Sequence, residues 1–435
     1  MKVDMLLSNA RAVLICDDTS GVICDGSVAI AGGVIVAVGP AVEIDSEVTA
    51  DQVIDLTGHI LMPGLVNLHT HLAMTLLRGV AENVDLQGFL ELVWAEEARV
   101  MDPVGVELGT RLGAVEALLG GTTTALDMYF HAEAAHRGAV AAGLRHVIGP
   151  VFFSFPGPDG LVWEQRRELA AAWTAMLSEI GGPHIPYVLM PHAPFTVDIE
   201  NLTELGVIAG ENHGFINTHC SENDEENAQT IASRGMRPVD CLVVSDVLAL
   251  SPVLAHAVRL DEKDRIKVAA AGASVAHCPG SNLKLGSGAA DVVGYQADGI
   301  RVGLGTDGCS SSNDLDMFAV MRLAANLARL VRNDPAAISA AEIVRMATLE
   351  GARAVRMGDR IGSVEVGKEA DLIALDTRVP HLTPLRDPYT AVVFAAGRSD
   401  VRHVWVAGDQ VVADRVPTRV DVTELLAAAD ARVAL

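Results

Sequence analysis

Hydrophobic and polar positions follow one repeating pattern through the middle of the chain. Short apolar or β-branched runs end in a polar residue, and each is followed by an Ala-rich segment with helical spacing. The eight runs are "ILMPGLVNLHTH" (60–71), "TTTALDMYF" (122–130), "RHVIGPVFF" (145–153), "PYVLMPHAP" (186–194), "GFINTHCSE" (214–222), "PVLAHAVRL" (252–260), "ASVAHCPGS" (273–281) and "RVGLGTDG" (301–308). Eight strands alternating with helices predict parallel βαβ units and an α/β fold, a closed (β/α)8 TIM-like barrel. A doubly wound open sheet is disfavoured, because no GxGxxG turn follows the first run.

The two ends of the chain show a different pattern. They carry strand-like runs separated by turns, such as "DGSVAIAGGVIVAVGP" and "VRHVWVAGDQVVAD". We therefore predict a small β-sandwich domain built from residues 1–58 together with 362–435, and a (β/α)8 hydrolase barrel over residues 59–361. Residues 338–357 have apolar positions at helical spacing and are predicted to be helical, as is the tail 421–435.

Composition and charge exclude several classes of partner. The chain has 435 residues, half of them hydrophobic, and its 32 basic and 56 acidic residues give a net charge of -24. Such a charge repels nucleic acid and anionic membranes, so we expect neither as a partner. There is no apolar run long enough to span a bilayer, and the start of the chain lacks the apolar segment of a signal peptide. The six scattered cysteines indicate free thiols in a reducing compartment, so a cytoplasmic location is predicted.

Histidines gather at the ends of the predicted strands, where a barrel carries its catalytic groups. Six of the fourteen histidines lie there: His69, His71, His192, His219, His256 and His277. His69 and His71 are two positions apart, so in a strand their imidazoles point to the same face. Asp307 ends the eighth run. Three imidazoles and one carboxylate would make a site that suits Zn²⁺ or Fe²⁺ and leaves room for a water molecule.

We predict one metal ion per chain. The expected ligands are His69, His71, His219 and Asp307. A bridged two-metal site would commonly use a modified lysine, whereas none of the five lysines ends the third or fourth strand. A bound divalent ion lowers the pKa of water toward 7 and so supplies a nucleophile. Glu222, three residues beyond His219, is placed to move protons as general acid and base, and His256 would orient the water.

Several motifs resemble the amidohydrolase superfamily, specifically its methylthioadenosine/S-adenosylhomocysteine deaminase branch. They are "VNLHTH", "PHAPFTV", "NTHCSEN", "LAHAV", "HCPGSNLKLGSG" and "GLGTDGCSSSNDLDMF", and they span nearly the whole chain. The resemblance implies zinc-dependent hydrolytic loss of ammonia from an adenosine thioether or a related adenine nucleoside. It also implies that Asp307 holds both the metal and the attacking water. Homo-oligomers are common among such proteins, and we expect one here.

The resemblance also implies substrate contacts. Glu97 would bind the ribose hydroxyls, His192 a purine nitrogen, and Trp94 would wall the pocket. Glu97 and Trp94 belong to a segment after the first strand that is long enough for a helical lid. The family places arginines after strand 3 to hold the homocysteine carboxylate, whereas this chain has "FFSFPGPDG" there. Arg166 and Arg167 come only later, and Arg167 is the candidate for that contact.

Two other functions remain open. The same chemistry would serve an aminohydrolase or chlorohydrolase acting on another heterocycle, such as an s-triazine, guanine or a pterin. A non-catalytic barrel scaffold would be expected to lose metal ligands, and this chain retains all of them. His277 fits a site residue or a loop former equally well. Asp127 and His131, after the second strand, are expected to support the site from outside it.

Overall fold

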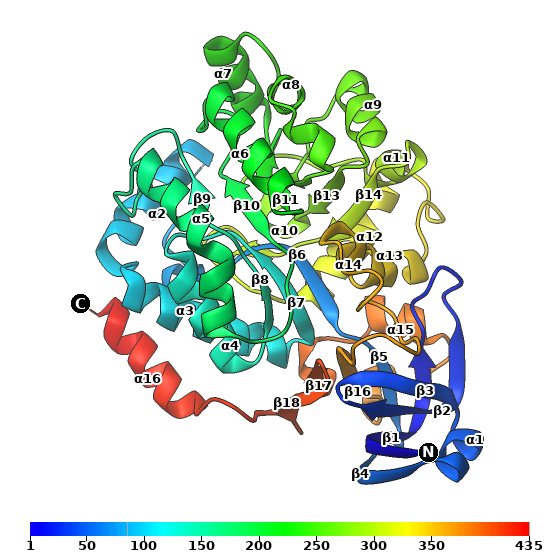
Figure 1. Cartoon of the computed structure of the whole chain (residues 1–435). Coiled ribbons are helices and arrows are strands. Elements are labelled where there is room, and N and C mark those ends of the chain that lie inside the picture. Colours follow the sequence, from blue (N-terminus) through cyan, green and yellow to red (C-terminus); the bar gives the residue numbers. More distant parts are fainter. Residues whose placement is uncertain (85, 435) are drawn as a thin grey trace.

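The computed structural model describes residues 1–84 and 86–434. Figure 1 shows a body of strands enclosed by helices and, beside it, a sheet in which blue N-terminal strands lie next to orange C-terminal ones. The strands of that terminal sheet are β1 (Lys2–Leu14), β2 (Val22–Ala31), β3 (Val34–Pro40), β4 (Thr49–Asp55), β5 (His59–Pro63), β16 (Leu372–Asp376), β17 (Val401–Val406), β18 (Asp409–Ala413) and β19 (Val416–Pro417). Their order is β19-β18-β17-β16-β5-β1-β2-β3, and β4 also pairs with β1. Both ends of the chain therefore contribute to one mixed sheet, as the pattern indicated.

The first predicted run proves to be two strands that belong to different sheets. β5 pairs with β1 and β16 in the terminal sheet, whereas β6 (Leu65–His71) begins the α/β body. The break falls at Gly64, whose N–H donates to the carbonyl of Asp371. A Cβ at Gly64 would lie only 2.1 Å from the Thr123 hydroxyl, so the chain crosses between the sheets where a side chain has no room.

The body contains two parallel sheets, and each of the eight predicted runs contains at least one of their strands. The remaining strands are β7 (Thr122–Asp127), β8 (Arg145–Val147), β9 (Val151–Phe152), β10 (Val188–Pro191), β11 (Phe215–Cys220), β12 (Val253–His256), β13 (Ser274–His277), β14 (Arg301–Leu304) and β15 (Asp307–Gly308). One sheet has the order β14-β13-β12-β11-β10-β9 and the other β15-β6-β7-β8. β8 and β9 lie within one predicted run, as do β14 and β15, so the chain passes from one sheet to the other at both joints. The parallel α/β arrangement expected from the sequence is confirmed.

Helices follow the strands and cover the body, whereas α1 lies against the terminal sheet (Figure 1). They are α1 (Ala41–Glu47), α2 (Leu86–Val100), α3 (Pro103–Leu119), α4 (Ala132–Ala142), α5 (Trp163–Ile180), α6 (Ile199–Glu211), α7 (Asp224–Arg234), α8 (Pro238–Val244), α9 (Glu262–Ala270), α10 (Pro279–Lys284), α11 (Val292–Ala297), α12 (Met317–Arg332), α13 (Ala340–Met346), α14 (Leu349–Ala354), α15 (Pro388–Phe394) and α16 (Val422–Val433). The predicted helix 338–357 is two short helices, α13 and α14, separated at Thr348 by non-helical backbone (φ -130°, ψ -91°). The predicted terminal helix is confirmed as α16, where Arg432 donates to the carbonyl of Val100.

None of the helices in the described part of the chain is both long enough and apolar enough to cross a membrane.

Candidate active site

Two neighbouring strands, β6 and β15, bring the first three candidate ligands together. His69 and His71 lie on one face of β6, and the backbone of Asp307 on β15 pairs with Thr70 between them. Gly305 allows this approach, because a Cβ there would lie 2.8 Å from the carbonyl oxygen of His69. As a result, Asp307 Oδ1 lies 3.2 Å from His71 Nε2 and 3.6 Å from His69 Nε2.

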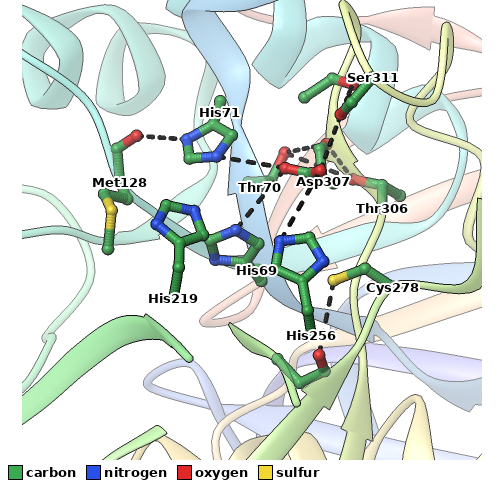
Figure 2. Close-up of polar contacts among 12 residues, drawn as sticks. His69, Thr70, His71, Met128, His219, His256, Cys278, Thr306, Asp307 and Ser311 are labelled. Carbon is green, nitrogen blue, oxygen red and sulfur yellow. Dashed lines mark hydrogen bonds and ion pairs between the residues drawn. The ribbon is translucent and has the colours of Figure 1, made fainter. Parts of the chain in front are cut away.

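Four imidazoles and Asp307 face one another at the ends of β6, β11, β12 and β15 (Figure 2). The ring of His69 lies 4.9 Å from that of His71, 4.9 Å from that of His219 and 5.4 Å from that of His256. Ligand-capable atoms lie within 4.8 Å of one another in two groups, His69 with His71 and His219, and His69 with His256 and Asp307. Because both groups share His69, they form a single site. The structure therefore brings the four predicted ligands together and adds His256.

For His71 and His219, hydrogen bonds determine which imidazole nitrogen could bind a metal. His71 Nδ1 lies 2.6 Å from the carbonyl of Met128, and His219 Nδ1 lies 2.7 Å from the carbonyl of His192. A carbonyl only accepts, so both Nδ1 atoms carry the proton and both Nε2 atoms are free to bind a metal. His69 is fully buried, and neither of its ring nitrogens has a hydrogen-bond partner. Such an imidazole is costly unless it binds something, and a metal ion fits the surrounding donors.

The charges of these groups suit a divalent cation. Burial lowers the pKa of His69 and His219 well below the usual value, so both imidazoles are neutral and offer a lone pair. Burial acts in the same direction on His71, but its hydrogen bond to Asp307 and the charge of Asp307 raise the pKa of His71 to about 9. Burial alone would raise the pKa of Asp307, yet the contact with His71 and the charge of His256 hold it well below the usual range. A bound metal ion would thus take the place of the proton on His71, beside the ionised carboxylate of Asp307.

Glu222 and His256 form a second pair of titratable groups at the site. Glu222 lies just beyond β11, and its Oε2 is 3.8 Å from His256 Nε2. The Ser287 hydroxyl donates to Glu222 Oε1 (3.4 Å), and His256 Nδ1 lies 2.9 Å from the amide oxygen of Asn282. Burial raises the pKa of Glu222, which brings its proton affinity closer to what a general acid and base needs near neutral pH. Burial lowers the pKa of His256, but the charges of Glu222 and Asp307 outweigh it, and the net shift is upward.

A cavity that is partly open to solvent extends from these groups. Its lining includes the aromatic side chains of Phe89, Trp94, Phe130, Phe153 and Phe195. Glu97 and His192, both predicted substrate contacts, also line it, as does Trp94 from the helix α2. The predicted lid segment therefore forms one wall of the cavity.

Glu97 is buried and His192 half-buried, and both place polar atoms at the cavity. The Tyr129 hydroxyl donates to Glu97 Oε1 (2.7 Å), and Glu97 Oε2 has no partner. Burial raises the pKa of Glu97 to about 7. The ring of His192 stacks on that of Phe153 at 4.8 Å, and its Nδ1 lies 3.1 Å from the Thr196 hydroxyl. Burial lowers the pKa of His192 to about 3, so the ring is neutral and its Nε2 remains to meet a ligand.

The two candidate arginines do not reach the cavity. Arg167 is half exposed and pairs with Glu204 at 2.6 Å, so the structure gives no support to its predicted contact with substrate. Arg166 is buried, and both carboxylate oxygens of Asp159 accept from it at 3.0 and 2.6 Å. Its guanidinium also donates to the carbonyl of Val151 (3.1 Å). Both terminal nitrogens of Arg166 are therefore bound by its own neighbours, and only its buried Nε has no partner among the described residues.

The remaining predicted residues do not line the cavity. Asp127 accepts from the backbone N–H of Leu72 (3.0 Å) and from His146 (2.8 Å), which anchors the chain directly after His71. His277 ends β13, where it is buried with both ring nitrogens unpaired, and it does not line the cavity. His131 precedes α4 and lies outside the cavity as well.

Sequence reasoning missed several residues that contact the site. They are Tyr129, Glu226, Asn282, Ser287 and Ser311. Each stands in or next to a motif already quoted, such as "TTTALDMYF", "SENDEEN" or "SNLKLGSG". In the sequence these residues are marked only by their position near the end of a predicted strand. That position does not show which of several polar side chains points toward the site.

The parallel α/β fold and the cluster of potential metal ligands fit a hydrolytic enzyme, and comparisons with known proteins agree. The amidohydrolase family matches residues 60–411, and the chain belongs to this family. A 5-methylthioadenosine/S-adenosylhomocysteine deaminase of Syntrophobacter fumaroxidans is 39% identical over 98% of this chain and 96% of its own. A 5'-deoxyadenosine deaminase of Methanothermobacter thermautotrophicus is 39% identical over 81% of this chain and 82% of its own. The crystal structure of an adenosine deaminase from Xanthomonas campestris with bound zinc superimposes with a TM-score of 0.95 at 37% identity, covering 99% of this chain and 98% of that one.

Proposed function

We propose that this protein is a zinc-dependent hydrolytic deaminase of adenine nucleosides. The observation that carries the proposal is His69, a fully buried imidazole with no hydrogen-bond partner, at the centre of a cluster of histidines and an aspartate. The names of the relatives described above support the reaction and the substrate class.

The metal site we propose holds one Zn²⁺, with Fe²⁺ as the alternative, in a donor set that suits either ion. The ligands are Nε2 of His69, His71 and His219 and a carboxylate oxygen of Asp307. When bound, such an ion lowers the pKa of a water molecule toward 7 and makes it a nucleophile at neutral pH.

The protein's own groups then manage the protons. Glu222 accepts one proton from the attacking water and passes it to the adjacent ring nitrogen as the C–O bond at position 6 of adenine forms. A second proton, from the new hydroxyl group, then passes through Glu222 to the amino group, so that the C–N bond breaks, ammonia leaves and a carbonyl remains at position 6. His256, between Glu222 and Asp307, holds the water in line by hydrogen bonding. Burial of these groups keeps bulk water away and strengthens their interactions.

The cavity favours a nucleoside with an uncharged 5' substituent. Aromatic side chains make up much of its lining, and among the described residues no lysine or arginine lines it. Arg166 is buried next to the ring of Phe153, 5.3 Å from the ring centroid, and is bound to Asp159. A carboxylate buried there without a partner would cost several kcal/mol. We therefore propose methylthioadenosine, 5'-deoxyadenosine or adenosine as better substrates than S-adenosylhomocysteine.

An ammonia-release panel tests this proposal. Zinc-loaded protein is assayed with the four nucleosides and with guanine, pterins and aminotriazines, and chloride release is measured with a chlorotriazine. Glu222→Gln is the control against a contaminating enzyme, and it should retain zinc while losing about 10²- to 10⁴-fold in turnover, because an amide cannot shuttle the proton. Activity confined to the non-nucleoside rings would overturn the nucleoside assignment. Preference for S-adenosylhomocysteine would overturn the argument from the aromatic lining.

We further propose that the two parallel sheets close into a single (β/α)8 barrel. The backbone N–H of Thr306 donates to the side chain of Asn67 on β6 (3.0 Å), which supports contact between β14 and β6 at one joint. At the other joint, β8 and β9 are separated by only three residues. The terminal sheet would then form the second domain, and the chain would pass from one domain to the other at Gly64.

The six free cysteines support a cytoplasmic location. The homo-oligomer stays a prediction from the resemblance.

A further inference from the structure

A second buried carboxylate, Glu226, is bound to the backbone next to Glu222 and also lines the cavity. It stands in the first turn of α7 and is 3% exposed. Its Oε1 accepts from the backbone N–H of Ser221 (3.0 Å), and its Oε2 accepts from the backbone N–H of Glu222 (2.6 Å). These two N–H groups flank the Cα of Ser221, whose φ is +52°. One carboxylate thus accepts hydrogen bonds from the N–H groups on both sides of the Cα of Ser221, which has left-handed backbone.

This arrangement is an anion site made of successive backbone N–H groups. A left-handed conformation costs a non-glycine residue about 1–2 kcal/mol, so it persists only where its surroundings hold it. Here it turns the chain sharply at the end of β11 and aims Glu222 into the cavity. If Ser221 relaxed to an extended conformation, Glu222 would point elsewhere.

Ordinary helix capping does not account for Glu226. The side chain of Asn223 already caps α7 by accepting from the backbone N–H of Glu226 (2.8 Å). Keeping Glu226 in place is also costly, because burial raises its pKa to about 7 and the nearby charge of Glu222 adds to this rise. A carboxylate maintained at such a cost points to a role beyond the helix.

We propose that Glu226 is a positioning residue that holds Ser221 in its left-handed turn and thereby places Glu222 for proton transfer. The proposal rests on the proposed function, since Glu222 is the acid and base of that reaction. A glutamine at position 226 keeps the size but offers only one acceptor atom, and its amide N–H₂ would face one of the two backbone N–H groups.

The first test compares Glu226→Gln with Glu225→Gln, the same change at the exposed neighbouring position of α7. Because misplaced catalytic groups lower turnover without altering ligand binding, Glu226→Gln should retain zinc and KM while kcat falls by about tenfold or more. Glu225→Gln should match the wild type. Zinc loss or a rise in KM that accounts for the whole effect would overturn the positioning role.

Two further variants separate positioning from a merely structural role. In a Glu222→Gln background, Glu226→Gln should cost little more, because its target is already disabled. A full additional loss would overturn the proposal. Glycine adopts left-handed backbone readily, so Ser221→Gly should restore part of the kcat that Glu226→Gln loses. Absence of any rescue would show that the turn at Ser221 is not what Glu226 controls.

Amide hydrogen exchange provides a readout that needs no turnover. In Glu226→Gln the backbone amides of Ser221 and Glu222 should exchange at least about tenfold faster than in Glu225→Gln, because their acceptor is weakened. Unchanged exchange would overturn the clamp even in an active enzyme. A wild-type protein that deaminates no nucleoside would instead overturn the proposed function and with it the catalytic purpose of the clamp, while faster exchange would still show that Glu226 holds the turn.

Discussion

Glu97, which we propose binds the ribose hydroxyls of the substrate, has a setting that would make substrate binding depend on pH. It is buried, it accepts from Tyr129 through one oxygen, and its other oxygen is unpaired in the cavity. Burial raises its pKa to about 7, an effect that the Tyr129 hydrogen bond and the charge of His71 reduce and the charge of Asp159 increases. Below that pH the group is protonated and is a poorer acceptor for substrate hydroxyls.

We therefore expect the KM for adenosine to rise as the pH falls. With a pKa of about 7, roughly a tenth of Glu97 is ionised one unit lower, so KM at about pH 6 should approach tenfold its value at about pH 8. Glu97→Gln cannot titrate, and its KM should be higher than that of the wild type at about pH 8 and flat across the range. Initial rates against substrate concentration at several pH values measure this. A flat wild-type KM with a sloping one in Glu97→Gln would contradict the assignment.

At the scale of elements, the sequence identified the C-terminal ends of the strands better than the points where one run divides into two strands. The period-2 spacing of His69 and His71 places both imidazoles on one face, and this geometry follows from the strand alone. The same run divides at Gly64, where Thr123 leaves no room for a side chain. Thr123 is far along the chain, so no local pattern reveals this constraint. Likewise, Arg167 and Arg166 read alike in sequence, and only the partners Glu204 and Asp159 show that neither faces the cavity.

An ion cluster joins β8 of the body to the terminal sheet. Arg145 is fully buried and pairs with Asp371 through two hydrogen bonds (3.0 and 2.8 Å) and with Glu369 at 2.5 Å. Arg145→Met would leave Asp371 buried without its charged partner, whereas Glu369 keeps Arg360, so we expect a loss of about 3–5 kcal/mol in the free energy of unfolding. Urea unfolding measures this loss.

The matched control is Arg378→Met, which removes an exposed arginine that pairs with Asp376 at the end of β16, while Asp376 keeps Arg402 as a second partner (3.6 Å). Losing an ion pair whose cation is exposed to solvent should cost at most about 1 kcal/mol. Equal losses in the two variants would show that the buried cluster does not stabilise the contact between the body and the sheet.

At the scale of the whole molecule, the site depends on segments that are far apart in sequence. His69 and Asp307 are 238 positions apart, and they meet because β15 pairs with β6. The repeat of strands and helices predicted this meeting, since parallel strands in such a body present their carboxyl ends at the same edge. The contacts that hold each ligand in its tautomer, such as the carbonyls of Met128 and His192, were not predictable because any backbone can supply them.

The number of metal ions is the last property of the whole chain that these arguments predict. The two candidate ligand groups share His69, and none of the lysines in the described residues lines the cavity to bridge a second ion. We therefore expect about one zinc per chain by elemental analysis, with near-complete loss in His219→Ala, because each ligand is needed for tight binding. His381→Ala, at an exposed pair with Asp400, should retain the full zinc content. Since a ligand that binds only the folded state stabilises it, chelation should lower the Tm of the wild type and leave that of His219→Ala unchanged. Two tightly bound zinc ions per wild-type chain would contradict the single site.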